Sequence, residues 1–217
     1  MAELNQLTVN EVKEMFLHVA DKVIGSKDLL TEVDSAIGDG DHGTGMSVGF
    51  KQAIENLNSK ELNTINDVFK TIGMSLISSM GGASGVIFGT VFLGGVKNLE
   101  NTKTLDTNIL AKIMTGSLEG VKERGKASLG DKTMIDALEP ASDALNESSS
   151  EKLSFLEALK KAEKAAEEGV EKSKEYVAKF GRAKTLGERA IGHQDAGATS
   201  VWIIFKSMRE WVETNNG

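Results

Sequence analysis

The sequence contains no cysteine, and this absence removes several chemistries at once. Without thiols the chain has no disulfide framework, no thiolate nucleophile and no zinc site built from cysteines. A chain of this kind suits a reducing compartment, so we expect a cytoplasmic protein. The stretch from Met1 to Asn10 shows no basic region followed by an apolar run, so we expect no secretory signal.

Long apolar runs and an excess of positive charge are missing as well. The most apolar stretch, residues 86–96, is broken by glycines and is far shorter than the roughly 20 residues of a membrane helix. The formal net charge is −7, whereas proteins that bind nucleic acids carry basic patches. We therefore expect no membrane and no nucleic-acid partner, and any phosphate ligand must be neutralised locally.

Proline is scarce, with one residue against 23 glycines. A single proline permits long helices, and the glycines mark turns or close backbone approaches. Apolar residues recur at helical spacing, whereas the sustained alternation typical of strands is absent. We predict one all-α domain over residues 1–217, with about eight helices and no sheet. The predicted helices cover residues 8–25, 46–57, 67–80, 84–99, 106–121, 131–146, 153–180 and 198–213, with a short helical turn at 29–36.

The chain from Asp34 to Met46 carries the strongest chemical signal. Asp34, Asp39 and Asp41 fall within eight residues and are threaded between glycines. Their mutual repulsion is costly unless a cation offsets it. Magnesium takes oxygen ligands, commonly a few carboxylates together with substrate phosphates. The stretch therefore predicts a metal and nucleotide site, and the alternative is a solvated loop whose aspartates serve turns and helix caps.

Three familiar motifs are suggested by parts of this sequence, and each fails. Residues 38–43 match the dinucleotide fingerprint, yet no strand precedes them and two variable positions are aspartates that repel phosphate. Residues 120–126 have P-loop spacing, but Ala127 stands where a Ser or Thr should reach magnesium. An EF-hand loop counted from Asp39 places Phe50 where the twelfth position requires Glu.

Two further stretches, residues 81–85 and 195–199, place small residues at the start of predicted helices. A helix start exposes unpaired N–H groups and the positive end of the dipole, which suits phosphate oxygens. Their recurrence beside the acidic stretch favours a nucleotide site over a plain loop. His42 can contact a phosphate, accept a phosphoryl group or cap a helix, and Arg182 can clamp a phosphate or remain on the surface.

Four separated motifs together resemble the nucleotide-binding subunit L of bacterial dihydroxyacetone kinase over nearly the whole chain. They are Asp34 with residues 38–43, then residues 81–85, 125–134 and 186–195, in the family's order and approximate spacing. The resemblance implies an all-helical barrel or bundle of eight antiparallel helices. It also implies that loops at one rim hold ADP or ATP and two magnesium ions, with Asp34, Asp39 and Asp41 as metal ligands.

The resemblance further implies a set of nucleotide contacts. They are His42, Gly43, Thr44, Gly45, Ala83, Ser84, Gly125, Met134, Arg182, Asp195, Ala196 and Gly197. Four positions depart from the family's pattern, because Gly45 replaces a usual Asn, Ala83 a usual Ser, and Val86 and Ala196 usual prolines. The lost asparagine side chain removes a phosphate contact from the loop at Gly45.

In the family, subunit L is half of a kinase. Subunit K holds dihydroxyacetone covalently through a histidine, and in the version driven by the phosphotransferase system subunit M rephosphorylates the ADP that stays on subunit L. His42 resembles that version, since ATP-consuming relatives commonly carry Thr or Cys there. We expect a phosphotransferase subunit, incomplete without K, that relays a phosphoryl group from M through Mg-bound ADP/ATP to the ketone on K.

The same residues leave other functions open. The chain can be an ATP-consuming ketose kinase subunit, a nucleotide-binding regulatory module or, against the four motifs, a purely structural bundle. No side chain is assigned as a catalytic acid, base or nucleophile, because transfer takes place on the bound nucleotide. The physiological ketose and the oligomeric state, including a homodimer, are also open.

Overall fold

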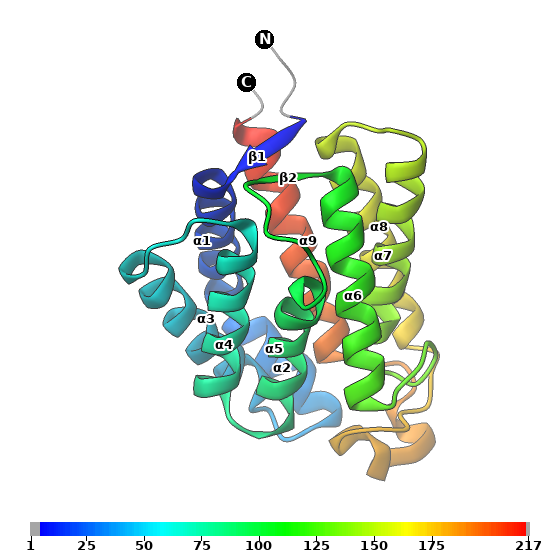
Figure 1. Cartoon of the computed structure of the whole chain (residues 1–217). Helices are drawn as coiled ribbons and strands as arrows, with labels where there is room; N and C mark the ends of the chain where they lie inside the picture. Colours follow the sequence, from blue (N-terminus) through cyan, green and yellow to red (C-terminus); the bar gives the residue numbers. More distant parts are fainter. Residues whose placement is uncertain (1–4, 216–217) are drawn as a thin grey trace.

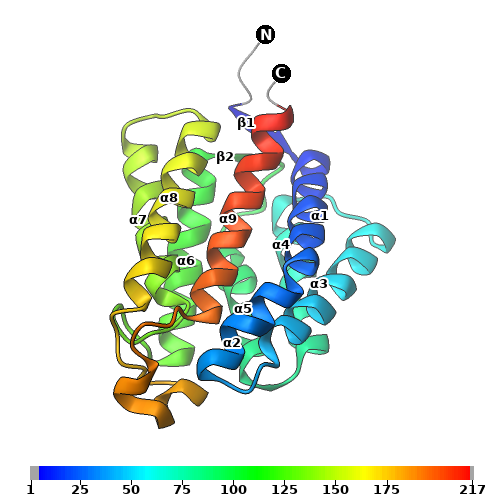
Figure 2. The ribbon, with the colours of Figure 1, turned by 180° about the vertical axis from the view of Figure 1, so that it is seen from behind.

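In the computed structural model, which describes residues 5–215, eight α-helices pack side by side and close into a ring (Figure 1). In order of contact they are α1 (Val9–Gly25), α3 (His42–Ser59), α4 (Ile65–Met80), α5 (Gly82–Val96), α6 (Thr107–Gly125), α7 (Ile135–Ser150), α8 (Phe155–Ser173) and α9 (Ala196–Asn215), which returns to α1. A further helix, α2 (Lys27–Ile37), packs against α3 and α9 at one end (Figure 2). The predicted all-α fold of about eight helices is confirmed.

The alternating direction of the ring helices decides where the connections lie. Every second connection falls at the same end of an antiparallel bundle. One end therefore collects residues 38–41, Gly81, residues 126–134 and residues 174–195, whereas β1 (Gln6–Thr8) and the end of α9 lie at the other (Figures 1 and 2). The four motifs that the sequence keeps far apart meet at this rim.

The inward faces of the ring helices are apolar and fill the interior. Phe16, Phe50, Phe69 and Phe92 are almost completely buried. The rings of Phe16 and Phe69 meet edge to face with centroids 5.1 Å apart, a favoured aromatic geometry. An apolar cavity lined in part by Phe16, Phe69 and Phe92 measures about 20 Å³. It is far too small for a nucleotide, whereas the cavity at the rim is large enough.

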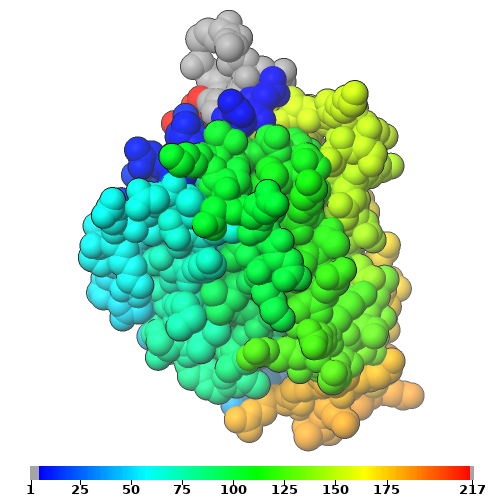
Figure 3. All heavy atoms as spheres, in the orientation of Figure 1, coloured from blue at the N-terminus to red at the C-terminus, as the bar shows by residue number. Residues whose placement is uncertain are grey.

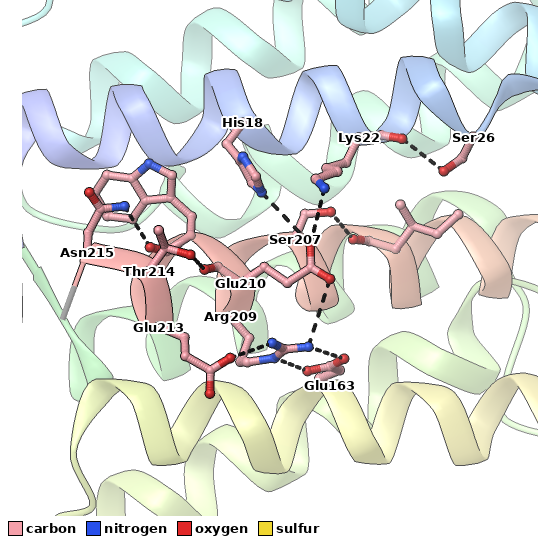
Figure 4. Close-up of polar contacts among 12 residues, drawn as sticks. His18, Lys22, Ser26, Glu163, Ser207, Arg209, Glu210, Glu213, Thr214 and Asn215 are labelled. Atoms are coloured by element: carbon pink, nitrogen blue, oxygen red, sulfur yellow. Dashed lines mark hydrogen bonds and ion pairs between the residues drawn. The ribbon is translucent and has the colours of Figure 1, made fainter. Parts of the chain in front are cut away.

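The helix that closes the ring, α9, is held on both sides by charged side chains (Figure 4). Arg209 donates its Nε to Glu163 Oε2 on α8 at 2.6 Å. On the other side, Glu210 lies 3.6 Å from Lys22 Nζ and 3.9 Å from His18 Nε2, both on α1. His18 thus belongs to a helix–helix contact. Within residues 5–215, no helix is long and apolar enough to cross a membrane.

A small sheet corrects the prediction that the chain has none. Strands β1 (Gln6–Thr8) and β2 (Thr104–Asp106) pair antiparallel, with Leu7 opposite Leu105. Both leucines are fully buried beneath the end of the ring. Each strand has three residues, which is too short for a period of two to be recognised in the sequence.

Five predicted helix boundaries differ from the structure by four residues or more, and four of them lie at the rim. Two of the five are helix ends that lie further along the chain than predicted, because α6 continues to Gly125 and α7 to Ser150. The predicted helix 153–180 ends at Ser173, and Val177 beyond it is 39% exposed. The chain leaves the helix because Ala178 packs into a second small cluster with Ile37 and Ala190. Helix α7 begins four residues later than predicted, and α3 begins four residues earlier, at His42. Residues 182–190 form two short 3-10 turns separated by a kink at Gly187, which has a φ of +58°; together they are labelled η1 (Arg182–Ala190).

The contact between α7 and α8 depends on Gly169. A Cβ atom built there would lie 2.0 Å from the carbonyl oxygen of Asp136, so the two backbones touch only because this side chain is absent. Gly169→Ala should therefore lower the free energy of unfolding by about 1–3 kcal/mol, the usual cost of overpacking. Urea unfolding measures the change. Gly25→Ala is the matched control, because its added methyl group meets nothing within 4 Å; equal stability losses in both variants would contradict the packing argument.

Candidate metal and nucleotide site

A cavity of about 950 Å³ opens at the rim where the four connections meet. Its walls come from the first turns of α3, α5, α7 and α9, from the loops before them, and from residues 180–183. The segment that contains η1 projects beside it at the lower end of the molecule (Figure 3). A cavity of this size is within the range of small-molecule and cofactor sites.

The three predicted metal ligands stand together in this cavity. Asp34 lies in the last turn of α2, and Asp39 and Asp41 lie in the turn that leads into α3. One carboxylate oxygen from each lies within 4.8 Å of the other two. Three hard oxygen donors at this separation suit magnesium, and they repel one another strongly without a cation. The donor set therefore fits the metal that the sequence predicted.

Two glycines make this arrangement of carboxylates feasible. A Cβ atom at Gly38 would lie 2.3 Å from Asp34 Oδ1, so the carboxylate occupies the space that any other residue would fill. Gly40 has a φ of +73°, in the left-handed region that favours glycine. In this chain, the glycines that match the dinucleotide fingerprint therefore position carboxylates.

Gly43 is the one predicted contact that does not line the cavity. A Cβ atom there would lie 2.2 Å from the carbonyl oxygen of Lys27 and 2.4 Å from Thr31 Oγ1. The residue therefore allows α3 to pack closely on α2, the helix that carries Asp34. A contact between Gly43 and a nucleotide stays a prediction.

His42 connects the acidic cluster to α9. Its backbone N–H donates to Asp34 Oδ2 at 3.2 Å, and its ring Nε2 lies 2.8 Å from Ser200 Oγ. Burial lowers the pKa of His42, although the nearby charges of Asp34 and Asp41 oppose that effect. The ring thereby fixes the start of α3 relative to α9, and with it the positions of Asp41 and Asp34.

The starts of three helices face the cavity with small residues. Thr44 and Gly45 lie in the first turn of α3, Ala83 and Ser84 in that of α5, and residues 196–197 in that of α9. N–H groups in a first helical turn have no partner within the helix, and the dipole is positive there. The three starts therefore offer phosphate oxygens hydrogen bonds close to the acidic cluster.

Arg182 places a positively charged side chain beside the acidic cluster. It begins η1, and its Nη2 lies 2.9 Å from Asp39 Oδ2. Three quarters of its side chain is exposed, so the guanidinium can change partners at little desolvation cost. The predicted contacts Gly125 and Met134 line the cavity as well, and Met134 faces Gly197, where an added Cβ atom would lie 3.2 Å from Met134 Cβ.

Several lining residues were not predicted from the sequence. Apolar side chains of Ile87, Phe88, Val121 and Phe180 contribute to the walls, and Lys132 and Thr133 lie between α6 and α7. Phe180 and Lys132 fall inside the predicted helices 153–180 and 131–146, so the wrong helix boundaries concealed both as lining residues. A helix prediction for 131–146 that began at the observed Ile135 would have left Lys132 in a loop beside Met134.

Known proteins resemble this chain closely. The DAK2 domain family matches residues 36–210. The chain is 41% identical over 188 residues to the PEP-dependent dihydroxyacetone kinase 1, ADP-binding subunit DhaL, of Listeria innocua, covering 87% of this chain and 89% of that protein. It is 41% identical over 179 residues to the corresponding PEP-dependent, ADP-binding subunit of Escherichia coli, covering 82% of this chain and 85% of that protein.

A solved structure shares the fold. The dihydroxyacetone kinase of C. freundii in complex with AMP-PNP and Mg²⁺ superposes with a TM-score of 0.72 and 27% sequence identity. The match covers 92% of this chain but 33% of that polypeptide, so the present chain spans about a third of it.

The carboxyl group of Asp195 makes the stability of this rim depend on pH. Desolvation raises its pKa to about 7, so folding favours the protonated form. The stability that this group contributes is complete below about pH 4 and is lost as the pH rises through 7. Asp195→Asn keeps an acceptor for the Ala198 N–H but cannot ionise.

We expect Asp195→Asn to match the parent protein at pH 4 and to exceed its stability at pH 8 by at most about 4 kcal/mol, since one pKa unit equals about 1.4 kcal/mol. Urea unfolding across this range provides the measurement. Asp143→Asn, at an exposed position on α7, should retain the parent profile. If the free energy of unfolding of Asp195→Asn and of the parent protein changed with pH in parallel, the carboxyl group of Asp195 would not be the source of the pH dependence.

Proposed function

This chain belongs to the DAK2 domain family, as a dihydroxyacetone kinase subunit of the L type, and we propose that it relays phosphoryl groups through a bound adenine nucleotide. In this proposal, ADP bound with two Mg²⁺ ions receives the phosphoryl group from a phosphotransferase-system subunit M. The ATP so formed passes it to dihydroxyacetone held on a subunit K. The chain acts as a single cytoplasmic domain in that complex.

The observation that carries the proposal is the acidic cluster, in which one oxygen from each of three aspartates lies within 4.8 Å of the other two. The cluster lines the same cavity as the first turns of α3, α5 and α9. Asp34, Asp39 and Asp41 would hold the metal ions. The N–H groups at the starts of α3, α5 and α9 would bind phosphate oxygens. Met134 and the apolar wall would pack against the adenine base, which needs an apolar surface with few polar contacts.

The chain's residues mainly position and neutralise charge. When bound, magnesium draws charge from the phosphate oxygens, which is most of what phosphoryl transfer requires of a protein. Arg182 adds positive charge at the outer edge of the cluster and would exchange Asp39 for a phosphate oxygen. His42 keeps the first turn of α3 in register with Asp34. The acceptor hydroxyl belongs to the ketone on the partner subunit, so the transfer is completed between subunits.

Removal of one metal ligand tests the assignment. Asp39→Ala should lower the affinity for ADP in the presence of magnesium by about a hundredfold or more, because an uncompensated contact between phosphate and two carboxylates is repulsive. Calorimetric titration of the nucleotide-free protein with and without EDTA measures this. Asp21→Ala, an equal change of charge at an exposed position on α1, should bind as the parent does. Unaltered, magnesium-dependent binding by Asp39→Ala would refute the metal assignment.

The direction of phosphoryl flow needs its own measurement. Nucleotide released from the purified protein identifies the ligand, and transfer from phosphorylated subunit M to bound ADP tests the relay. Retained ADP that turns over with subunit M supports the relay. Free exchange with ATP, and activity that does not need subunit M, would instead identify an ATP-consuming ketose kinase subunit. Nucleotide binding without any transfer to a ketone on subunit K would identify a regulatory module.

Gly45 offers a gain-of-affinity test. An added Cβ atom there meets Met80 Cε alone among its neighbours, at 3.8 Å, so the asparagine usual in the family would fit. Gly45→Asn should raise the affinity for Mg-ADP by about threefold to tenfold, the value of one phosphate hydrogen bond. Gly45→Ala adds the same Cβ atom without the amide and serves as the control in the same titration. Equal affinities of the two variants would contradict a phosphate contact at this position.

A further inference from the structure

Lys132 is a buried cation at the rim that the proposed metal and phosphate contacts do not use. It lies in the loop between α6 and α7, has a φ of +58°, and is 2% exposed. Among the described residues it is the one lysine or arginine in the fully buried class. A charged group is buried only when its hydrogen bonds are satisfied, so its partners indicate what it does.

Those partners are backbone carbonyls across the rim. Lys132 Nζ donates to the carbonyl oxygen of Ser173, at the end of α8, at 2.6 Å, and to the carbonyl oxygen of His193. Ser173 is itself a junction, because its Oγ accepts the backbone N–H of Asp195 at 3.0 Å. Two of the three ammonium protons are therefore committed to main-chain oxygens. Although Lys132 lines the cavity, this commitment favours a role in positioning over direct binding of a phosphate.

The two segments that Lys132 joins each carry a proposed nucleotide contact. Met134 follows it by two residues, and His193 precedes Asp195 by two residues. The segments also touch directly, because a Cβ atom at Gly197 would lie 3.3 Å from the backbone nitrogen of Met134. A shift of either segment would therefore move Met134 relative to residues 195–197.

The loop around Lys132 is rigid enough to transmit that constraint. Asp136, in the first turn of α7, accepts the N–H groups of Gly130 at 2.6 Å and Thr133 at 2.8 Å. The charges of Asp195 and Asp136 both favour the protonated ammonium, while burial lowers the pKa of Lys132. The loop is thus fixed at its α7 end by Asp136 and across the rim by Lys132.

We propose that Lys132 is a positioning residue, whose buried ammonium joins the Met134 loop to the segment of residues 193–197 and so sets the separation between two walls of the nucleotide site. This inference rests on the proposed function. Lys132 acts through Met134 and Asp195, and its own atoms need not touch the nucleotide.

The first test is hydrogen exchange on the nucleotide-free protein, which does not depend on any ligand. Lys132→Met should accelerate amide exchange in residues 128–135 and 191–198 by about tenfold or more, with α1 and α4 unchanged. Lys179→Met is the matched control: Lys179 holds the same loop through Asp131 at 2.6 Å, but it comes from residues 174–181 and two thirds of its side chain is exposed. Uniformly faster exchange throughout the protein, or equal effects of the two substitutions, would overturn the proposal.

The second test is a double-mutant cycle on Mg-ADP affinity. Lys132→Met should weaken binding by about tenfold to a hundredfold, and Lys132→Arg, which keeps the charge and donors, should restore part of it. If Lys132 acts through Met134, the double variant Lys132→Met with Met134→Ala should lose less binding free energy for Mg-ADP than the two single variants lose in sum. Additive losses would indicate a separate contact and overturn the positioning role.

Lys132→Gln, which keeps a donor on a shorter and uncharged side chain, keeps the test decisive if Lys132→Met does not fold: exchange in residues 128–135 and 191–198 should accelerate, and unchanged exchange there would overturn the proposal. Ser173→Ala tests the adjoining link, because it removes the acceptor of the Asp195 N–H from a residue outside the cavity lining and leaves the carbonyl oxygen that accepts from Lys132. Binding of Mg-ADP should weaken by at least about threefold, since a hydrogen bond that fixes residue 195 is lost, and unchanged binding would argue against control of the site through this junction. Failure of the parent protein to bind Mg-ADP would refute the proposed function, and the exchange experiment would then decide the role of Lys132 alone.

Discussion

The burial of one apolar face on each of eight helices is the constraint on which this structure depends. A closed ring gives every helix two neighbours, and short connections make those neighbours antiparallel. All helices of one direction then begin at the same rim, so α3, α5, α7 and α9 direct their positive dipole ends to one place. The phosphate-binding capacity of the rim is therefore a consequence of the topology rather than of any single motif.

The second constraint is the close approach of like charges. Three aspartates can stand within 4.8 Å only if the backbone leaves room and a cation balances them. Gly38 leaves the space that Asp34 Oδ1 occupies, and Gly43 lets α3 pack on the helix that carries Asp34. In the described structure Arg182 already places a guanidinium against Asp39. The glycines in this stretch thus allow the aspartate carboxylates to stand close together, and the resulting negative charge favours binding of a cation.

Two buried side chains hold parts of the cavity wall in place. His42 connects α3 to α9 through Ser200. Lys132 connects the α6–α7 loop to the end of α8 and to the chain before α9. A nucleotide needs its phosphates and its base to be bound at a fixed separation, because misplacement by about 1 Å is costly in catalysis. Two buried links of this kind supply that fixed geometry.

Much of this could be predicted from the sequence because the signals are local. The helical spacing of apolar residues gave the fold class and most helices, and in the structure Thr8 and Asp106 cap α1 and α6. The motif order gave the family, and fourteen of the fifteen predicted site residues line the cavity, the exception being Gly43. The boundaries at the rim failed, since residues 131–134 and 174–180 have helical composition but are drawn out of the helices by long-range contacts.

The sequence by itself determined the helices, the acidic cluster and the glycines between its members, because these depend on neighbours within a few residues. The tertiary structure decided which helix starts share a cavity, that Phe180 and Lys132 belong to it, and that β1 pairs with β2. Lys132 illustrates the reason. Its partners, Ser173 and His193, lie 41 and 61 residues further along the chain, so only the closed ring brings its ammonium to the carbonyl oxygens that make its burial stable.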